Sequence, residues 1–273
     1  MQRFVLSCFL LIGLALPAVA QSSRIDTLYQ ALGLPEIVAI MRQEGIGYGA
    51  ELETDLFPAR GGARWAAMIE QIYDPVRMEA ALRQGLDREL AGADLDPMVE
   101  FFSNDRGKRI VALEVSARRA LLDDGVDEAS RATLDEMILA RDPRLELVRI
   151  FAAANDLVEN NVVGAMNSNY AFYIGLADGG AFGTDLTEEQ ILTDVWSQED
   201  AIRDDTEEWL YSYLTLAYQP LSDEDLEAYI AFSETEAGGD LNRALFEAFD
   251  DMFTAISTAL GLAASTFISG EDL

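Results

Sequence analysis

Apolar residues recur at intervals of three and four along most of the chain, the spacing that places them on one face of an α-helix. A helix is predicted from Pro35, where proline suits the first turn and Ile37, Ile40 and Met41 share a face. Another helix is predicted after Asp74, which suits the cap position and is followed by a proline. Alternation with a period of two, the pattern of a half-buried strand, is scarce.

Two longer apolar stripes predict long helices in the second half of the chain. The first predicts a single helix that begins after Arg144, and its members are Leu147, Phe151, Ala154, Val158, Val162, Ala165, Asn169 and Tyr173. The second consists of Leu241, Leu245, Phe249, Met252, Ile256, Leu260 and Phe267. The run YAFYIGLA at 170–177 also suits a strand when taken alone, which leaves one alternative open. The whole pattern predicts an all-α protein, a multi-helix bundle.

A short phrase occurs twice: FFSNDRGKRI begins at Phe101, and FSETEAGGDL begins at Phe232. In each copy a glycine follows the phenylalanine six positions later, as Gly107 and Gly238. Each copy stands between two segments of helical spacing, which places it at a junction of helices. The phenylalanines would close the preceding helix onto the core, and the glycines would let another backbone come close.

The polar positions of the phrase suit the start of a helix. Asn104 and Thr235 are predicted N-caps, because their side-chain oxygens can accept from the amides of the first turn. Asp105 and Glu236 follow at a position where a carboxylate complements the helix dipole. Phe102 extends the first copy into an aromatic pair. The phrase is therefore predicted to be structural.

The two halves of the chain also begin alike, since LPEIVAIM at 34–41 is similar to RLELVRIF at 144–151. Together with the repeated phrase, this similarity predicts two related helical halves from an internal duplication. The predicted organisation is a signal peptide at 1–20, a first half at 21–142 with its motif at 101–107, and a second half at 143–273 with its motif at 232–238 and an insertion near 177–200.

The first twenty residues, MQRFVLSCFLLIGLALPAVA, have the layout of a secretory signal peptide. Arg3 supplies a positive start, an apolar core follows, and Ala18 to Ala20 form a cleavage site of small residues. The protein is therefore expected to be periplasmic or secreted, without stable membrane insertion after cleavage. Cys8 is the only cysteine and would leave with the signal peptide, so no disulfide can support the mature fold.

The formal net charge of −30 disfavours binding to nucleic acids or anionic lipid surfaces. The chain contains no histidine, which removes the commonest general base and metal ligand near neutral pH. Zinc, copper, haem and thiol chemistry are disfavoured, and Ser-His-Asp and Cys-His arrangements are excluded. The sequence thus predicts no cofactor, no metal and no catalytic residue.

One acidic loop, DGGAFGTDLTEE at 178–189, partly matches the spacing of an EF-hand. Gly180 and Phe182 offer no side-chain oxygen at two positions that need one, so the ligand set is depleted. The loop is predicted to be a flexible insertion leading into a helix capped by Asp185 or Thr187. Weak calcium binding through the acidic loops is left as a third functional possibility.

The repeated phrase, between an acidic helix and an amphipathic one, resembles the secreted bacterial family called domain of unknown function 2059 (DUF2059). The family's aromatic pair corresponds to Phe101 and Phe102, and Ser233 replaces its second member in the later copy. Asn104 and Thr235 stand at the family's serine position. At its proline position this chain has an acidic residue in both copies. The resemblance implies a helical, exported protein and supplies no catalytic residues.

Aromatic residues are the candidates for lining a ligand site, although aromatic residues at such spacing more often belong to the core. The candidates are Trp65, Trp196, Trp209 and Tyr211, with Tyr213 and Tyr218 nearby in sequence. The composition favours a non-enzymatic protein that binds an unidentified protein or small molecule between its two halves. The alternative is a hydrolase that uses carboxylates alone on glycans or the cell wall, which would need two carboxylates converging in a cleft.

Overall fold

The computed structural model describes residues 16–182 and 187–268. Every element of regular secondary structure in these residues is an α-helix, which confirms the predicted all-α multi-helix bundle. The helices are α1 (Leu16–Ala31), α2 (Leu34–Leu56), α3 (Gly62–Ile72), α4 (Pro75–Glu89), α5 (Asp96–Ser103), α6 (Asp105–Ala120), α7 (Asp124–Ala140), α8 (Pro143–Ala154), α9 (Leu157–Asp178), α10 (Glu188–Trp196), α11 (Glu199–Tyr218), α12 (Asp223–Ser233) and α13 (Glu236–Ile268).

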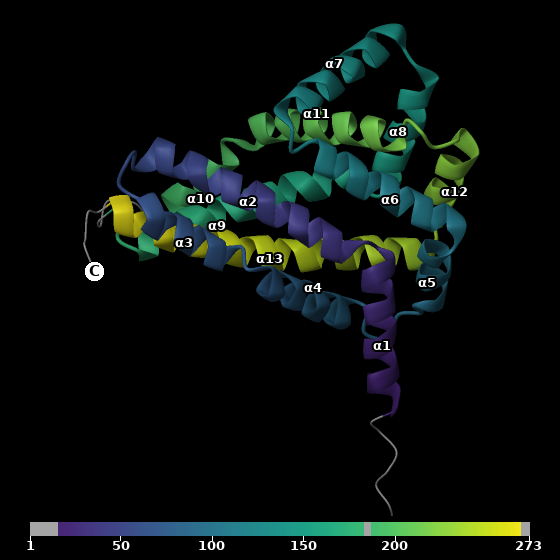
Figure 1. Cartoon of the computed structure of the whole chain (residues 1–273), viewed down its shortest axis with the longest axis horizontal. Coiled ribbons are helices and arrows are strands. Elements are labelled where there is room, and N and C mark those ends of the chain that lie inside the picture. Colours follow the sequence, from purple (N-terminus) through teal and green to yellow (C-terminus); the bar gives the residue numbers. More distant parts are fainter. Residues whose placement is uncertain (1–15, 183–186, 269–273) are drawn as a thin grey trace, which may run out of the picture.

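Helix α13 is the central element of the bundle and runs across the molecule in Figure 1. Its 33 residues pack most extensively against α9 and then against α4, with further contacts to α2, α3, α5 and α12. Leu241, Met252, Ile256 and Leu260 of the predicted stripe are buried on it. By length and composition alone, α13 could also cross a membrane.

Small residues allow the neighbouring helices to approach α13 closely. A Cβ atom added at Gly261 would lie 2.8 Å from the amide nitrogen of Leu176 on α9. One added at Gly85 on α4 would lie 2.6 Å from the Cβ atom of Ala248 on α13. The side chains at these crossings are therefore small because the helix backbones nearly touch there.

The single long helix predicted after Arg144 is wrong, since the structure divides it into α8 and α9. Asp156 lies between them in the left-handed conformation, with φ 48° and ψ 36°. Asn and Asp enter this region at lower cost than most residues. The backbone oxygen of Asn155 accepts from the side-chain amide of Asn242 on α13 at 2.8 Å, which fixes the break. The run 170–177 lies within α9, so the strand alternative is also wrong.

Both copies of the repeated phrase have the caps that the sequence predicts. The Asn104 side chain accepts from the Gly107 amide at 2.9 Å at the start of α6. The Thr235 hydroxyl accepts from the Gly238 amide at 3.0 Å at the start of α13. Asp105 is the first residue of α6, where its carboxylate lies near the exposed amides of the first turn.

The glycines of the phrase occupy equivalent and equally tight positions. A Cβ atom at Gly107 would lie 2.7 Å from the Cα atom of Phe102, and one at Gly238 would lie 2.8 Å from the Cα atom of Ser233. Each added atom would also overlap the carbonyl oxygen of the first phenylalanine in its own copy. The phrase thus builds the same close helix–helix turn twice.

The ends of the predicted organisation are only partly described. Helix α1 includes the predicted cleavage point after Ala20, and its Ile25, Leu28 and Tyr29 are buried in the core. The rest of the predicted signal peptide lies outside the described residues. In the predicted insertion, Thr187 caps α10 through a reciprocal pair of hydrogen bonds with Gln190, and Asp185 lies outside the described residues.

Candidate functional site

A cavity of about 720 Å³ is lined by residues of α2, α5, α6, α8, α9, α11, α12 and α13. Much of its lining is apolar, including Ile37, Met41, Val111, Val115, Phe151, Leu214, Leu245 and Phe249. A volume of this size is typical of small-molecule sites, which are mostly apolar with a few polar groups. The polar groups therefore indicate what chemistry the cavity can select.

The most distinctive polar group in the cavity is the carboxyl of Glu114 on α6. The Tyr218 hydroxyl donates to Glu114 Oε1 at 2.6 Å. The Tyr229 hydroxyl makes a second hydrogen bond to the same carboxyl. The Tyr213 hydroxyl donates to the backbone oxygen of Glu114 at 3.3 Å. Tyrosines from α11 and α12 therefore hold this one residue of α6 at two points, its carboxyl and its carbonyl.

Burial raises the pKa of the Glu114 carboxyl to about 7, and the hydrogen bonds from Tyr218 and Tyr229 oppose this rise. The pKa values of both phenols lie well above their ordinary value, first because of burial and then because of the nearby Glu114 charge. Glu114 has no ion pair within the part of the chain that the structure describes. Glu114 is therefore a half-buried acceptor that forms an ion pair with no cation among the described residues.

The arginine nearest in sequence on the same face of α6, Arg118, is occupied by another acid. Its Nε and terminal nitrogen donate to the two carboxylate oxygens of Glu44 on α2, at 3.1 and 2.8 Å. Its guanidinium also lies 5.7 Å from the ring centre of Trp209, which stacks on Tyr213. Arg118 thus neutralises Glu44 and leaves the charge of Glu114 uncompensated.

Aromatic rings form a shell around the carboxyl. The Phe151 ring lies 4.6 Å from that of Tyr229 and 5.4 Å from that of Tyr218. The two phenylalanines of the repeated phrase, Phe101 and Phe232, stack on each other at 4.2 Å. Phe101 also stacks on Tyr229 at 5.6 Å, so the repeated phrase packs directly against one of the tyrosines that hold Glu114.

Polar residues near the α8–α9 break also line the cavity. The side-chain amides of Asn160 and Asn242 donate to the backbone oxygen of Asn155, and that of Asn161 donates to the backbone oxygen of Leu157. Each asparagine uses its NH₂ group in this way, which leaves its amide oxygen for a ligand. Glu247 and Asp250 on α13 complete this part of the lining, which is rich in acceptors.

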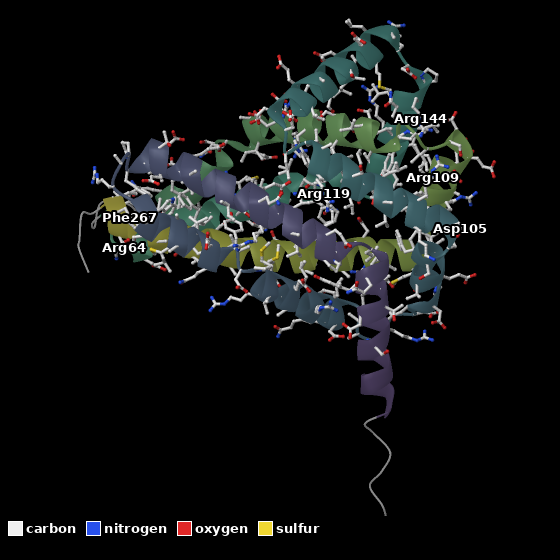
Figure 2. The ribbon with its side chains drawn as sticks, viewed as in Figure 1. Arg64, Asp105, Arg109, Arg119, Arg144 and Phe267 are labelled. Carbon is white, nitrogen blue, oxygen red and sulfur yellow. The ribbon has the colours of Figure 1, made fainter. Side chains whose placement is uncertain are left out.

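Two arginines from distant parts of the chain fix the connection between α11 and α12, near which they lie in Figure 2. Arg109 donates to the backbone oxygen of Pro220 at 2.7 Å. Arg144 donates to the backbone oxygens of Tyr218 and Leu221 at 2.8 and 2.9 Å. These contacts tie the α11–α12 connection to α6 and α8. The connection lies between Tyr218 and Tyr229 in the chain, so the contacts help to position both tyrosines.

The aromatic candidates from the sequence are dispersed through the structure. Trp209 lines the cavity. Trp65 is buried elsewhere in the core, where its indole nitrogen donates to the backbone oxygen of Gly49 at 2.6 Å. Trp196 is 58% exposed, and Tyr211 lies outside the cavity lining. The structure therefore does not bring the four candidates together.

Residues of the repeated phrase also contribute to the cavity, since Phe102, Phe232 and Gly238 belong to its lining. Sequence reasoning missed Glu114, although one signal for it exists. It is the single acid inside the apolar run IVALEV at 110–115, on a helix whose other charged residues lie outside this run. An acid on the apolar face of an amphipathic helix is unusual and indicates a specific environment.

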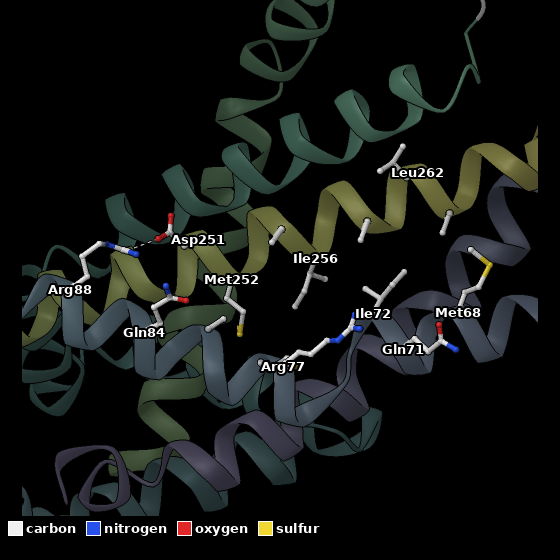
Figure 3. A pocket seen from close by; sticks show the side chains of 15 residues that line it. Met68, Gln71, Ile72, Arg77, Gln84, Arg88, Asp251, Met252, Ile256 and Leu262 are labelled. Carbon is white, nitrogen blue, oxygen red and sulfur yellow. Dashed lines mark hydrogen bonds and ion pairs between the residues drawn. The ribbon is translucent and has the colours of Figure 1, made fainter. Parts of the chain in front are cut away.

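A second hollow of about 620 Å³ lies along α3, α4 and α13 (Figure 3). Its lining is mainly methionine, alanine and aliphatic side chains, with Arg77 and two glutamines at its sides. Arg88 forms an ion pair with Asp251 at 2.5 Å across one end. This groove has no buried charged group comparable to Glu114.

Within residues 16–182 and 187–268, no group of three or more histidine, cysteine, aspartate or glutamate side chains could hold a metal ion. The chain matches no protein-family model, no curated protein and no solved structure in the comparisons made with them. The function is therefore inferred from the residues of the cavity.

Proposed function

We propose that this protein is an exported, non-enzymatic binding protein whose central cavity holds a small ligand with an apolar body and a polar head group. The observation that carries the proposal is the Glu114 carboxyl, held by Tyr218 and Tyr229 inside an apolar cavity of about 720 Å³. Burying a lone carboxyl costs stability unless it is compensated. A ligand that hydrogen-bonds to it would offset that cost.

Export and family membership remain part of the proposal and rest on the sequence. The layout of the first twenty residues supports secretion, and the repeated phrase supports a relationship to DUF2059. The acidic surface suits a protein that stays dissolved outside the cell and carries its ligand without binding polyanions.

An internal duplication is also proposed, with the halves 21–142 and 143–273; within them α1–α6 are matched to α8–α13, and α7 of the first half lies outside this match. The support comes from equivalent packing: α1 contacts α2, α4 and α5, and α8 likewise contacts α9, α11 and α12. Each half also packs one helix against the other half: α4 of the first contacts α13, and α11 of the second contacts α6. This order pairs α2 with α9, whereas the similarity of 34–41 to 144–151 pairs α2 with α8.

Hydrolysis is the alternative, and one observation favours it: a carboxyl with a pKa of about 7 can act as a general acid near neutral pH. A glycosidase also needs a second carboxylate at a fixed separation. The other carboxylates of the cavity lining are Glu247 and Asp250, and Asp250 already accepts two hydrogen bonds from Asn167 at 3.1 Å. Binding therefore explains the site with fewer additional requirements.

The test of the binding function is titration with the neutral, apolar fluorophore N-phenyl-1-naphthylamine. We expect saturable binding with one molecule per chain, because much of the cavity lining is apolar and its volume suits one small molecule. The variant Leu245→Trp fills the cavity and should abolish binding, while circular dichroism shows an unchanged helix content. Leu139→Trp is the matched control, since Leu139 is 85% exposed on α7. Equal binding by Leu245→Trp and the wild-type protein would contradict the proposal.

A further inference from the structure

Resting on the proposed binding function, we propose that the head group of the ligand is a protonated amine, which lies against Glu114. The Glu114 carboxyl accepts from Tyr218 and Tyr229 and retains lone pairs that the phenols do not use. An ammonium group would add a charge-assisted hydrogen bond and supply the missing positive charge. A neutral hydroxyl would supply only the hydrogen bond.

The rings around the carboxyl favour a cation for a separate reason. Tyr218, Tyr229 and Phe151 lie within 4.6–6.4 Å of one another, measured between ring centres. Ring faces attract cations through the aromatic quadrupole, most strongly where water is excluded. All three rings line the cavity, so an ammonium group near Glu114 would contact aromatic carbon as well as the carboxylate.

The other polar residues of the cavity lining also favour a ligand that donates hydrogen bonds. The amide oxygens of Asn160, Asn161 and Asn242 are free to accept, and Glu247 and Asp250 add negative charge. An anionic head group would meet only one cation in the lining, Arg118, whose charge is already neutralised by Glu44. The net charge of −30 raises the local concentration of cations and lowers that of anions.

The amine should bind more tightly as the pH rises through the pKa of Glu114, about 7, because only the ionised carboxyl attracts the cation. The groups that face Glu114 are Tyr213 and Tyr218 from α11 and Tyr229 from α12, with the Arg118–Glu44 pair nearby. The pKa values of the three phenols are raised, so they stay neutral in this range. We expect binding at pH 8 to be about tenfold tighter than at pH 5.5.

The experiment compares three eight-carbon probes by isothermal titration calorimetry at pH 8: octylammonium, 1-octanol and octanoate. Their apolar bodies match, so differences in affinity report the head group. In the wild-type protein we expect octylammonium to bind at least tenfold more tightly than octanol, and octanoate to bind most weakly. In Glu114→Gln, which keeps the shape of the side chain, the preference for the amine over the alcohol should disappear.

Glu136→Gln is the control, because it removes the same charge from an exposed position on α7 and should keep the preference. The inference is overturned if octanol binds as tightly as octylammonium to the wild-type protein, or if Glu114→Gln retains the preference. Absence of binding by all three probes and by the neutral fluorophore is a different result, which contradicts the proposed binding function itself.

Discussion

The α5–α6 and α12–α13 junctions have the same turn, yet the helices that follow them place different side chains at equivalent positions of one cavity. In each junction a side-chain cap lies three residues before a glycine that contacts the preceding backbone. Four pairs of residues at equal separations from Phe101 and Phe232 line the cavity: Val111 and Asn242, Glu114 and Leu245, Val115 and Phe246, and Arg118 and Phe249.

The comparison separates the residues that define the turns from the residues that define the lining of the cavity. The caps and glycines are chemically equivalent in both copies, and they place two helix faces on the same cavity. At the thirteenth position after the phenylalanine, however, α6 has Glu114 and α13 has Leu245. The carboxyl that the tyrosines hold therefore comes from the first copy, and at the equivalent position the second copy supplies an apolar side chain.

The largest expected effect comes from removing the feature that the junctions share. Gly107→Val and Gly238→Val should each lower the free energy of unfolding by about 3 kcal/mol or more, because the new side chain overlaps backbone atoms. Gly238→Val should be the more severe, since α13 is the central helix. Urea denaturation measures both. Gly239→Ala is the control, because its Cβ atom would meet open space. Wild-type stability in both valine variants would contradict the equivalence of the turns.

The next effect separates the two helices through pH. The pKa of Glu114 is raised in the folded state, from an ordinary 4.5 to about 7, so folding favours its protonated form. Its stabilising contribution is complete below pH 4.5 and is lost as the pH rises through about 7. Glu114→Gln should therefore gain about 2 kcal/mol relative to the wild-type protein between pH 5 and pH 8.

Urea denaturation of both proteins at the two pH values measures this gain. The difference between them isolates Glu114 from the many other acids of the chain. Glu136→Gln, the exposed control on α7, should show no comparable change. A stability difference that stays constant from pH 5 to pH 8 would show that Glu114 is ionised in both states.

The caps should give a smaller and symmetric effect. Asn104→Ala and Thr235→Ala each leave a first-turn amide without its side-chain acceptor, at a cost of about 1 kcal/mol. Serine at either position keeps an acceptor and should restore most of the stability. Thermal unfolding by circular dichroism measures these changes. A cost at only one of the two positions would show that the copies are not equivalent.

The smallest effect concerns contact between the copies themselves. The Phe101 and Phe232 rings stack at 4.2 Å with an interplanar angle of 16°. A double-mutant cycle with Phe101→Leu and Phe232→Leu should give a coupling energy of about 0.5 kcal/mol in urea denaturation. If the two substitutions have strictly additive effects on the free energy of unfolding, each ring stabilises the fold through its own burial and the stacking contact adds nothing.

The helical class and both capped turns could be predicted from the sequence, because these depend on local chemistry. Apolar spacing, Pro75 after Asp74 and the side chains of Asn104 and Thr235 act within a few residues of themselves. The α8–α9 break escaped prediction because the apolar stripe continues through Asn155 and Asp156. The break is instead marked by a contact 87 residues distant in the chain, between the backbone oxygen of Asn155 and the side chain of Asn242 on α13.

The candidate site depends on distances along the chain that local patterns do not report. Glu114 meets Tyr218 across 104 residues, and Arg118 meets Glu44 across 74. The aromatic residues are abundant enough that their sequence spacing does not distinguish Trp209, which lines the cavity, from Trp65, which lies in the core. Their roles follow from the packing of α6, α11 and α13.

The central position of α13 has a consequence for the order of folding. Its partners α2, α3, α4, α5, α9 and α12 all precede it in the chain, so they are synthesised before the helix that covers their apolar faces. Contacts of such long sequence separation form late and slow the folding reaction. Until α13 is synthesised, the nascent chain exposes the apolar helix faces that α13 later covers. Such surfaces are prone to aggregation, and a chaperone would bind to them.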